Sequence, residues 1–378
     1  MGAITSSFSK PRVRLAMVAF SAVVVIVVLV LALVLSPGGS GSSSPEPTGS
    51  GSPSNSPSPS PTPSPPPFGA SPVDGTLIEL TELARLQQRL PLAVMIENDP
   101  DARPQSGLNR ADLVYEAISE GGITRFMAVY WRNEAERIEY LRSARIYYIQ
   151  WASELGAVYV HWGQVEDPGP VDVWPVLSRL NMRVLNGMFM GEEVGYRNPN
   201  RYAPHNVYTN TGLLWSTSQA HAYAGPPTLQ PWLFKVDEAV LADNPALRSA
   251  RVVEVTFGNP GSAFHVTWHY DSATNGYLRS MGGAPHTDGT SGEQLSARNV
   301  AVQFATLRPS GVKSYNIIDT VGSGRAVVFR DGIAIEGSWR KDSEPGRTRF
   351  YDAAGNEISF NRGRTWIEVV PSDSAVGY

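Results

Sequence analysis

The chain has 378 residues and no cysteine, which excludes disulfide bonds and a lipid-modified cysteine in this sequence. Its formal net charge is −4. An acidic chain is a poor ligand for nucleic acid, because that binding relies on cationic contacts with phosphates. We therefore predict no nucleic-acid partner, and the length allows one large domain or two.

The first predicted element is the uncharged apolar run over residues 15–35. As a helix rising about 1.5 Å per residue it would span about 30 Å, the thickness of a bilayer's hydrocarbon core. The flanking basic residues lie on its N-terminal side, which places residues 1–14 in the cytoplasm. A cleaved signal peptide is the alternative, but residues 33–37 match a cleavage site poorly. We predict a retained single-pass cell-membrane anchor over residues 15–36, with the bulk of the chain extracytoplasmic.

Residues 37–71 are rich in serine, proline and glycine, and they follow the anchor directly. The part from 37 to 67 holds 11 of the chain's 30 prolines and one charge, Glu46. Such a segment cannot bury apolar surface, and alternating Ser-Pro favours extended polyproline II. We predict a disordered linker that tethers the folded part to the membrane; a proline-rich ligand for a partner is the alternative.

Residues 72–225 are predicted to form an α+β domain. Paired glycines at 121 and 122 predict a tight hairpin, because glycine supplies the positive φ of a primed turn. The spacing of apolar residues assigns the other elements. In chain order we expect a weak helix over 78–90, strands over 92–96, 111–119 and 123–131, a helix over 145–155, a strand over 157–162, and helices over 171–180 and 212–224.

Residues 250–372 are predicted to form a β-rich domain, after a proline-containing connection over 225–249. The predicted fold class is therefore α+β: an N-terminal transmembrane helix, a disordered linker, an α+β half and a β-rich half. The strands expected in the second half cover residues 252–257, 264–270, 277–281, 300–305, 325–329, 333–339 and 366–370.

The predicted hairpin is the densest polar region. A two-residue loop places Ile118 opposite Arg125, and side chains alternate along a strand, so Asp112, Glu116, Glu120 and Arg125 would share one face. An arginine between two carboxylates keeps both ionised, which is poor preparation for a general acid. The face is either a structural ladder of ion pairs or the floor of a polar cleft.

A second candidate region precedes the helix expected over 145–155. Arg142, Ser143 and Arg145 would place two guanidinium groups and a hydroxyl near the helix N-terminus, where a carboxylate or phosphate could bind. The alternative is that Ser143 caps the helix and the arginines pair with acids such as Glu116.

The histidines show no zinc-ligand spacing, and cysteine is absent, so we predict neither a metal nor a cofactor. A site built from His161 and His205 with a carboxylate is the alternative. The predicted polar site comprises Glu97, Asn98, Arg103, Asp112, Glu116, Glu120, Arg125, Arg142, Ser143, Arg145, His161, His205 and Asn206.

Several segments of the chain are similar to one known family. They are PLAVMIEN (91–98), ARPQSGL (102–108), ADLVYE (111–116), EGGITRF (120–126), RSAR (142–145), APHNVY (203–208), PHTD (285–288) and GRTWI (363–367). With these motifs the chain resembles the bacterial YerB-like lipoprotein family. The resemblance implies a two-part, membrane-attached, extracytoplasmic domain of unknown function, and it supplies no catalytic residues. The chain departs from a lipoprotein in lacking the cysteine that carries the lipid.

Two functions fit the sequence. The first is a cell-envelope binding or accessory module whose polar groove recognises a cell-wall glycan or an envelope protein. The second is a glycan hydrolase or lyase in which Glu97, Glu116 or Glu120 acts as acid and base. In that case the arginines would bind an anionic group of the substrate. We favour the binding module, because the predicted charges neutralise one another and no nucleophile motif is present.

Overall fold

The computed structural model describes residues 67–166, 169–236, 248–257 and 262–378, and these belong to one compact unit, Ser64–Tyr378. The predicted anchor and all but the last few residues of the predicted linker lie outside the described residues. Among the described residues, none of the helices has the length and apolar composition of a membrane span.

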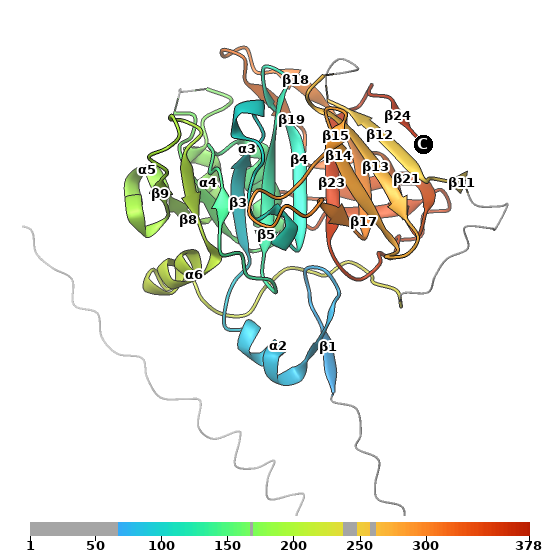
Figure 1. The fold of residues 1–378 in the computed structure, drawn as a ribbon, viewed down its shortest axis with the longest axis horizontal. Helices are drawn as coiled ribbons and strands as arrows, with labels where there is room; N and C mark the ends of the chain where they lie inside the picture. The colour runs from blue at the N-terminus through green and yellow to red at the C-terminus, as the bar shows by residue number, and fades with distance from the viewer. Residues whose placement is uncertain (1–66, 167–168, 237–247, 258–261) are drawn as a thin grey trace, which may run out of the picture. The chain divides into compact units, whose positions relative to one another are not determined.

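A central sheet of 11 strands takes its strands from both halves of the sequence (Figure 1). The second half joins the first where β23 runs parallel to β4. In sheet order the strands are β11 (Arg248–Ser249), β21 (Ile333–Lys341), β20 (Gly322–Arg330), β17 (Asn299–Ala305), β23 (Thr365–Pro371), β4 (Leu113–Glu120), β5 (Ile123–Tyr130), β3 (Leu92–Glu97), β7 (Val158–His161) and β8 (Arg183–Asn186), with β22 (Arg349–Asp352) beside β21.

A second sheet of six strands packs on one face of the central sheet. Its strands β12 and β13 alternate buried and more exposed residues, as one solvent-facing side requires. The buried Val255 and Trp268 join the same core cluster as Phe329 and Trp366 of the central sheet. The strands are β15 (Ala284–Pro285), β14 (Gly276–Met281), β13 (His265–Asp271), β12 (Val252–Thr256) and β24 (Val376–Gly377), with β16 (Ser296–Ala297) beside β14.

The opposite face of the central sheet is covered by an aromatic helix, α3 (Ile146–Glu154). Trp151 of α3 stacks on Tyr115 of β4 with ring centroids 5.3 Å apart. Burying a large apolar side chain contributes about 1.5–3 kcal/mol, so this contact fixes the helix on the sheet. The remaining helices are α2 (Leu80–Leu86), α4 (Trp174–Arg179), α5 (Gly187–Met190) and α6 (Thr211–Ala220), with 3-10 turns η1 (Pro100–Ala102), η2 (Leu108–Arg110) and η3 (Gly191–Glu193).

Small sheets complete the described elements. They are β1 (Phe68–Ala70) with β2 (Leu77–Glu79); β6 (Ile138–Glu139), β10 (Val207–Thr209) and β9 (Tyr196–Arg197); and β18 (Leu307–Pro309) with β19 (Asn316–Ile318). The mixed, strand-rich α+β fold class is confirmed. The helix expected over 78–90 is shorter than predicted, because the strand β2 occupies its start.

The predicted register of the hairpin is wrong by one residue. Ile118 lies opposite Thr124, and Ala117 opposite Arg125, because the register shifts between Ile118 and Glu120. This shift leaves one extra residue in β4, a β-bulge. Glu116 therefore shares a face with Thr124, and Arg125 points to the other side of the sheet. The predicted single face of Asp112, Glu116, Glu120 and Arg125 does not exist.

Candidate functional site

The carboxyl ends of three parallel strands meet at one edge of the central sheet. β3 pairs in parallel with β7, and β7 with β8, so that their last residues, Glu97, His161 and Asn186, lie along this edge. Ligands of open α/β sheets bind beyond such carboxyl ends. We call this region the carboxyl edge, and it also includes the loops that follow the three strands.

Glu97 is the central carboxylate of the carboxyl edge. Its side chain is only 3% exposed, and it lies 2.8 Å from Arg142 Nε through Oε1 and 2.8 Å from His205 Nδ1 through Oε2. Both partners are 23% exposed. A buried carboxylate therefore fixes two groups that reach the solvent, and Arg142 and His205 come from segments distant in sequence.

Asn98, the next residue, connects the carboxyl edge to the interior. Its amide donates to Thr124 Oγ1 at 2.7 Å and to Glu116 Oε1 at 3.2 Å. Its side-chain oxygen accepts from Arg103 Nε at 3.1 Å and from Gln105 at 3.0 Å. Burial lowers the pKa of Arg103 to about 10, so this guanidinium remains charged at neutral pH.

Glu116 does not face solvent. It is fully buried and forms an ion pair with Arg279 of β14, which is itself fully buried between the two sheets. Arg279 also contacts His286, whose other ring nitrogen lies 3.0 Å from Gln105 Oε1. Trp268 Nε1 donates to Glu368 at 2.9 Å. We call Glu116, Arg279, His286 and Glu368 the inter-sheet cluster.

Sequence reasoning missed three members of the inter-sheet cluster. Arg279 stands two residues from both Tyr277 and Met281, so strand alternation places it on their buried side. Glu368 is the lone charge in the apolar run of β23. A charged residue on the apolar face of a strand indicates a buried ion pair, and this signal was available in the sequence.

A third group contains Glu120, Arg125 and Arg145. Arg145 donates to both carboxylate oxygens of Glu120, at 2.6 and 3.1 Å, and Arg125 forms a further ion pair with it. Burial raises the pKa of Glu120, but the two guanidinium groups outweigh burial and the net pKa is lowered. Burial and the charge of Arg145 lower the pKa of Arg125 to about 10. Arg125 and Arg145 thus pair with Glu120 rather than with Glu116.

The loop that carries Arg142 and Arg145 contains Ser143, which does not cap α3. Residue Arg145 occupies the N-cap position, without a side-chain hydrogen bond to the helix. The Ser143 carbonyl accepts from Arg125 at 3.3 Å, and its hydroxyl donates to Trp162 O at 3.4 Å. The alternative in which Ser143 caps the helix is therefore wrong, and Ser143 connects the loop to β5 and to the residue after β7.

Three further candidates have structural roles. Asp112 is buried and accepts the backbone N–H groups of Trp131 and Arg132, at 2.7 and 2.8 Å. Burial raises the pKa of Asp112 to about 7. Asn206 accepts from Arg197 at 2.7 Å.

The third of these candidates is His161, whose side chain is fully buried. Its Nδ1 donates to Gly163 O at 2.8 Å, so that ring nitrogen carries the proton. Burial lowers the pKa of His161 to about 4. His161 does not join His205 in a group able to hold a metal among the described residues.

Apolar side chains are exposed beside the polar residues of the carboxyl edge. Trp174 and Phe189 lie with ring centroids 6.0 Å apart, and both are exposed, as is Met188. A Cβ on Gly163 would lie 2.9 Å from Ser143 Oγ and 3.9 Å from Met188 Cγ, so the apolar group adjoins the arginine loop. We call Trp174, Met188 and Phe189 the apolar rim.

A separate cavity of about 370 Å³ lies elsewhere and contains none of the predicted site residues. It is lined by Gly107, Asn109, Arg110, Glu134, Glu136, Arg137, Asp288, Thr290, Ser291 and Glu293. The predicted site residues are therefore divided: at the carboxyl edge Arg142 and His205 reach the solvent, whereas Asp112 and Glu116 are buried elsewhere.

Comparison with known proteins agrees with this fold. The protein-family model described as "Protein of unknown function (DUF3048) N-terminal domain" matches residues 80–224. The family model of the corresponding C-terminal domain matches residues 253–367. "Putative lipoprotein YerB" of Bacillus subtilis (strain 168) is 30% identical over 305 residues, covering 81% of this chain and 88% of the relative.

A solved structure gives the same result. The crystal structure of the YerB protein from Bacillus subtilis matches with a TM-score of 0.71 at 27% sequence identity, covering 82% of this chain and 98% of that chain. The resemblance drawn from sequence motifs is confirmed: this chain belongs to the DUF3048 family of proteins of unknown function.

Proposed function

We propose that this protein is a membrane-attached, extracytoplasmic binding module that recognises a glycan of the cell envelope at its carboxyl edge. The run over residues 15–35 supports attachment, because it is long and apolar enough to cross a bilayer as a helix. The relative from Bacillus subtilis is named a lipoprotein, and such a protein is held on a membrane by lipid. A transmembrane anchor would replace that lipid here.

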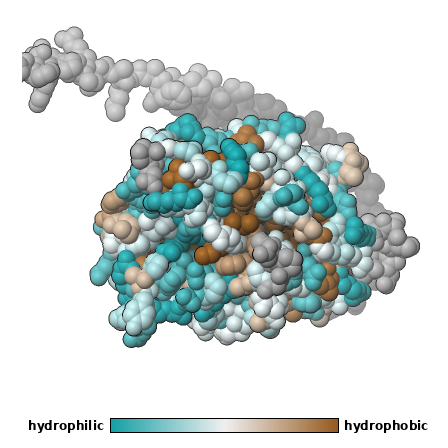
Figure 2. Space-filling model, turned by 90° about the horizontal axis from the view of Figure 1, so that it is seen from above, coloured by the Kyte–Doolittle hydropathy of each residue, from teal (hydrophilic) through white to brown (hydrophobic). Residues whose placement is uncertain are grey.

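The juxtaposition of the apolar rim with the ion pairs of Glu97 and Glu120 carries this proposal. Sugar rings present apolar faces that stack on aromatic side chains, while their hydroxyl groups bond to charged planar groups. The rim offers Trp174 and Phe189, and the adjoining loop offers Arg142. The face in Figure 2 is mostly hydrophilic and its hydrophobic residues form small separate groups, as a surface in water requires.

The carboxyl groups favour binding over hydrolysis. A general acid needs a raised pKa and access to the substrate. Among the described residues, the carboxyl groups with a raised pKa are Asp112 and Glu368, and both are fully buried. Glu120, which is part-exposed, has a lowered pKa. Glu120, which is held by Arg125 and Arg145, is thus poorly suited to donate a proton.

The test uses a fragment over residues 64–378, since these form one compact unit. The fragment is incubated with insoluble cell-wall glycan, and bound protein and released sugars are both measured. We expect retention without release, and at least a tenfold weaker retention for the double variant W174A/F189A. Phe68→Ala is the matched control, because Phe68 is an exposed aromatic of β1.

Equal retention of the control and the double variant would contradict glycan binding at the rim. Sugar release that disappears in Glu97→Gln, with the fold intact, would instead make the protein a hydrolase or lyase. A separate experiment tests attachment: N-terminal sequencing of the protein extracted from membranes. We expect the natural N-terminus, and a new N-terminus near residue 37 would contradict a retained anchor.

A further inference from the structure

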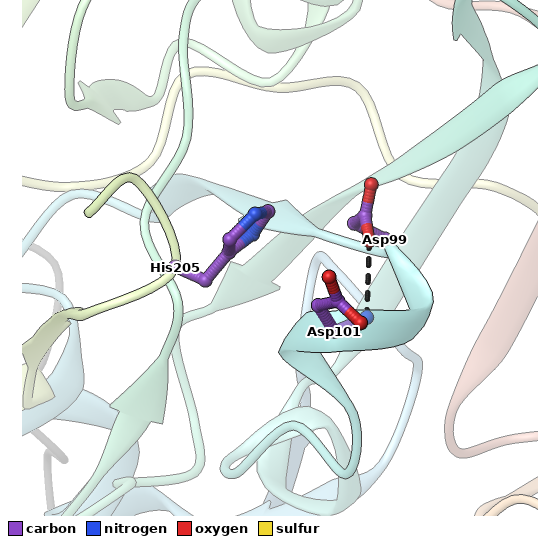
Figure 3. Close-up of side chains that lie close together, drawn as sticks. All are labelled: Asp99, Asp101 and His205. Carbon is purple, nitrogen blue, oxygen red and sulfur yellow. Dashed lines mark hydrogen bonds between the residues drawn. The ribbon is translucent and has the colours of Figure 1, made fainter. Parts of the chain in front are cut away.

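Three side chains with metal-binding atoms converge beside Glu97. One ligand atom each from Asp99, Asp101 and His205 lies within 4.8 Å of the others. Asp99 directly precedes η1 and Asp101 lies in it, whereas His205 comes from a loop more than 100 residues later. In Figure 3 the imidazole extends from its loop toward the two carboxylates.

Each of the three side chains keeps one atom that could bind a metal and that has no partner among the described residues. Asp99 Oδ1 accepts the backbone N–H of Asp101 at 3.0 Å, which leaves its other oxygen available. The Asp101 carboxylate has no hydrogen bond or ion pair with any other residue that the structure describes. Asp99 and Asp101 lie close together. Among the residues that the structure describes, no cationic side chain forms an ion pair with either carboxylate. A cation between them would relieve this repulsion.

Glu97 lies where a residue that orients a metal-binding histidine would lie. It is not one of the three side chains, and it holds His205 Nδ1 at 2.8 Å from a buried position. Metal-bound histidines bond their other ring nitrogen to a carboxylate in this way, which fixes the tautomer and the ring orientation. Because Nδ1 is occupied, Nε2 is the nitrogen left for a metal. Arg142, 2.8 Å from the same carboxylate, holds the Glu97 side chain in place.

The two segments that carry the three side chains are also tied together. Arg201 donates to the backbone carbonyl of Asp101 at 2.6 Å. The Asn206 amide donates to Arg201 O at 3.2 Å, next to His205. A site whose segments are held before the ion arrives loses less conformational freedom on binding.

We propose that Asp99, Asp101 and His205 bind one divalent cation of the zinc class, with Glu97 as the residue that positions His205. Two carboxylate oxygens and one imidazole nitrogen form a ligand set that Zn²⁺ accepts, whereas Mg²⁺ and Ca²⁺ prefer oxygen ligands alone. Three protein ligands leave a coordination position open for water or a bound ligand. The sequence-based prediction of no metal rested on the spacing of the histidines and on the absence of cysteine. Local spacing is uninformative for ligands so far apart in the chain.

The experiment is a calorimetric titration of the full-length, metal-stripped protein with ZnCl₂. We expect one ion per chain, and at least a tenfold weaker affinity for D101N and for H205Q. Glu97→Gln leaves all three metal-binding side chains in place. We expect it to weaken Zn²⁺ binding by about 10–100-fold, because the His205 ring loses the carboxylate that orients it. Titration with MgCl₂ is expected to give at least tenfold weaker binding.

Matched controls use an aspartate and a histidine elsewhere on the surface. Asp342 and His221 are both exposed, so D342N and H221Q should bind Zn²⁺ like the wild type. Thermal melting of each variant without metal checks the fold. Visible absorption of the Co²⁺-loaded protein should change in H205Q, because the imidazole leaves the coordination sphere.

Equal Zn²⁺ affinity of the wild type, D101N and H205Q would overturn the site. Should H205Q lose binding while E97Q keeps wild-type affinity, the positioning role of Glu97 would be overturned. The inference does not depend on glycan recognition, because the variant W174A/F189A leaves all three ligands in place and should bind Zn²⁺ normally.

Discussion

Two groups of glutamate and arginine side chains in this protein share their chemistry and differ in position. In the inter-sheet cluster, Glu116 and Arg279 are completely buried between the two sheets. At the carboxyl edge, Glu97 is also buried, but its partners Arg142 and His205 reach the solvent. A charge pair buried on both sides can only hold the structure together, whereas a pair with one accessible partner can also meet a ligand.

The largest expected effect is in the inter-sheet cluster. Arg279→Met should lower the free energy of unfolding by about 3–5 kcal/mol, because it leaves the buried Glu116 carboxylate without its cation. Denaturation by urea measures the loss. Arg340→Met is the control, since Arg340 pairs with Asp342 on the surface, where such pairs contribute about 1 kcal/mol or less. Similar losses in both variants would show that the buried Glu116–Arg279 pair stabilises the fold no more than a surface ion pair does.

A pH series sharpens the comparison at the carboxyl edge. Burial lowers the pKa of His161 to about 4 from its ordinary 6.5, so the folded protein holds this ring neutral while the unfolded chain takes up a proton. The contribution of His161 to stability is therefore complete above pH 6.5 and is lost as the pH falls toward 4. The loss approaches about 3 kcal/mol, since one pKa unit corresponds to about 1.4 kcal/mol.

Urea denaturation at pH 7.5 and at pH 4.5 tests this dependence. The variant His161→Gln should lose less stability between the two pH values than the wild type. The exposed His221 supplies the control, and H221Q should follow the wild type. A wild-type slope in H161Q would show that another group carries the pH dependence.

The register of the hairpin is tested by two double-mutant cycles. Arg125→Ala combined with Glu120→Gln should show a coupling energy of about 0.5–3 kcal/mol, because Arg125 and Glu120 form an ion pair. The same replacement combined with Glu116→Gln should be additive within about 0.5 kcal/mol, since Arg125 and Glu116 lie on opposite faces. Strong coupling in the second cycle would restore the shared face that the sequence predicts.

The smallest expected effect compares two helix starts. Asn210 caps α6, and its side chain accepts from the backbone of Leu213 at 2.8 Å, so Asn210→Ala should cost about 1 kcal/mol. Ser143 caps no helix, and S143A should change stability by less than about 0.5 kcal/mol. Thermal melting of both variants checks this, and a larger loss in S143A would favour the alternative in which Ser143 caps α3.

The sequence predicts the elements of the first half well, for a physical reason. The strands β3, β4, β5 and β7 are short apolar runs bounded by turn residues, and the hairpin glycines have positive φ, 60° at Gly121 and 80° at Gly122. The register between β4 and β5 escapes such reasoning. A bulge adds one residue without changing the composition of either strand, and it moves every later side chain to the other face.

The candidate site is predictable only in part, because its partners come from segments distant in sequence. Glu97, Arg142 and His205 are recognisable one by one as polar residues beside apolar strands, but their contact depends on how the loops return to the edge. Asp99, which caps η1, and Asp101 are not among the site residues predicted from the sequence. Their proximity to His205 follows from the three-dimensional fold alone.

The parallel pairing of β4 with β23 has a consequence for the order of events during synthesis. Leu113 of β4 lies opposite Thr365 of β23, about 250 residues later in the chain. Until residues 365–371 have been made, β4 is paired on one side only and exposes an unpaired strand edge, which promotes aggregation. Contacts this far apart in sequence also slow folding. The central sheet is therefore completed only when the last strands of the chain have emerged, and a truncated product would keep an open edge beside the candidate site.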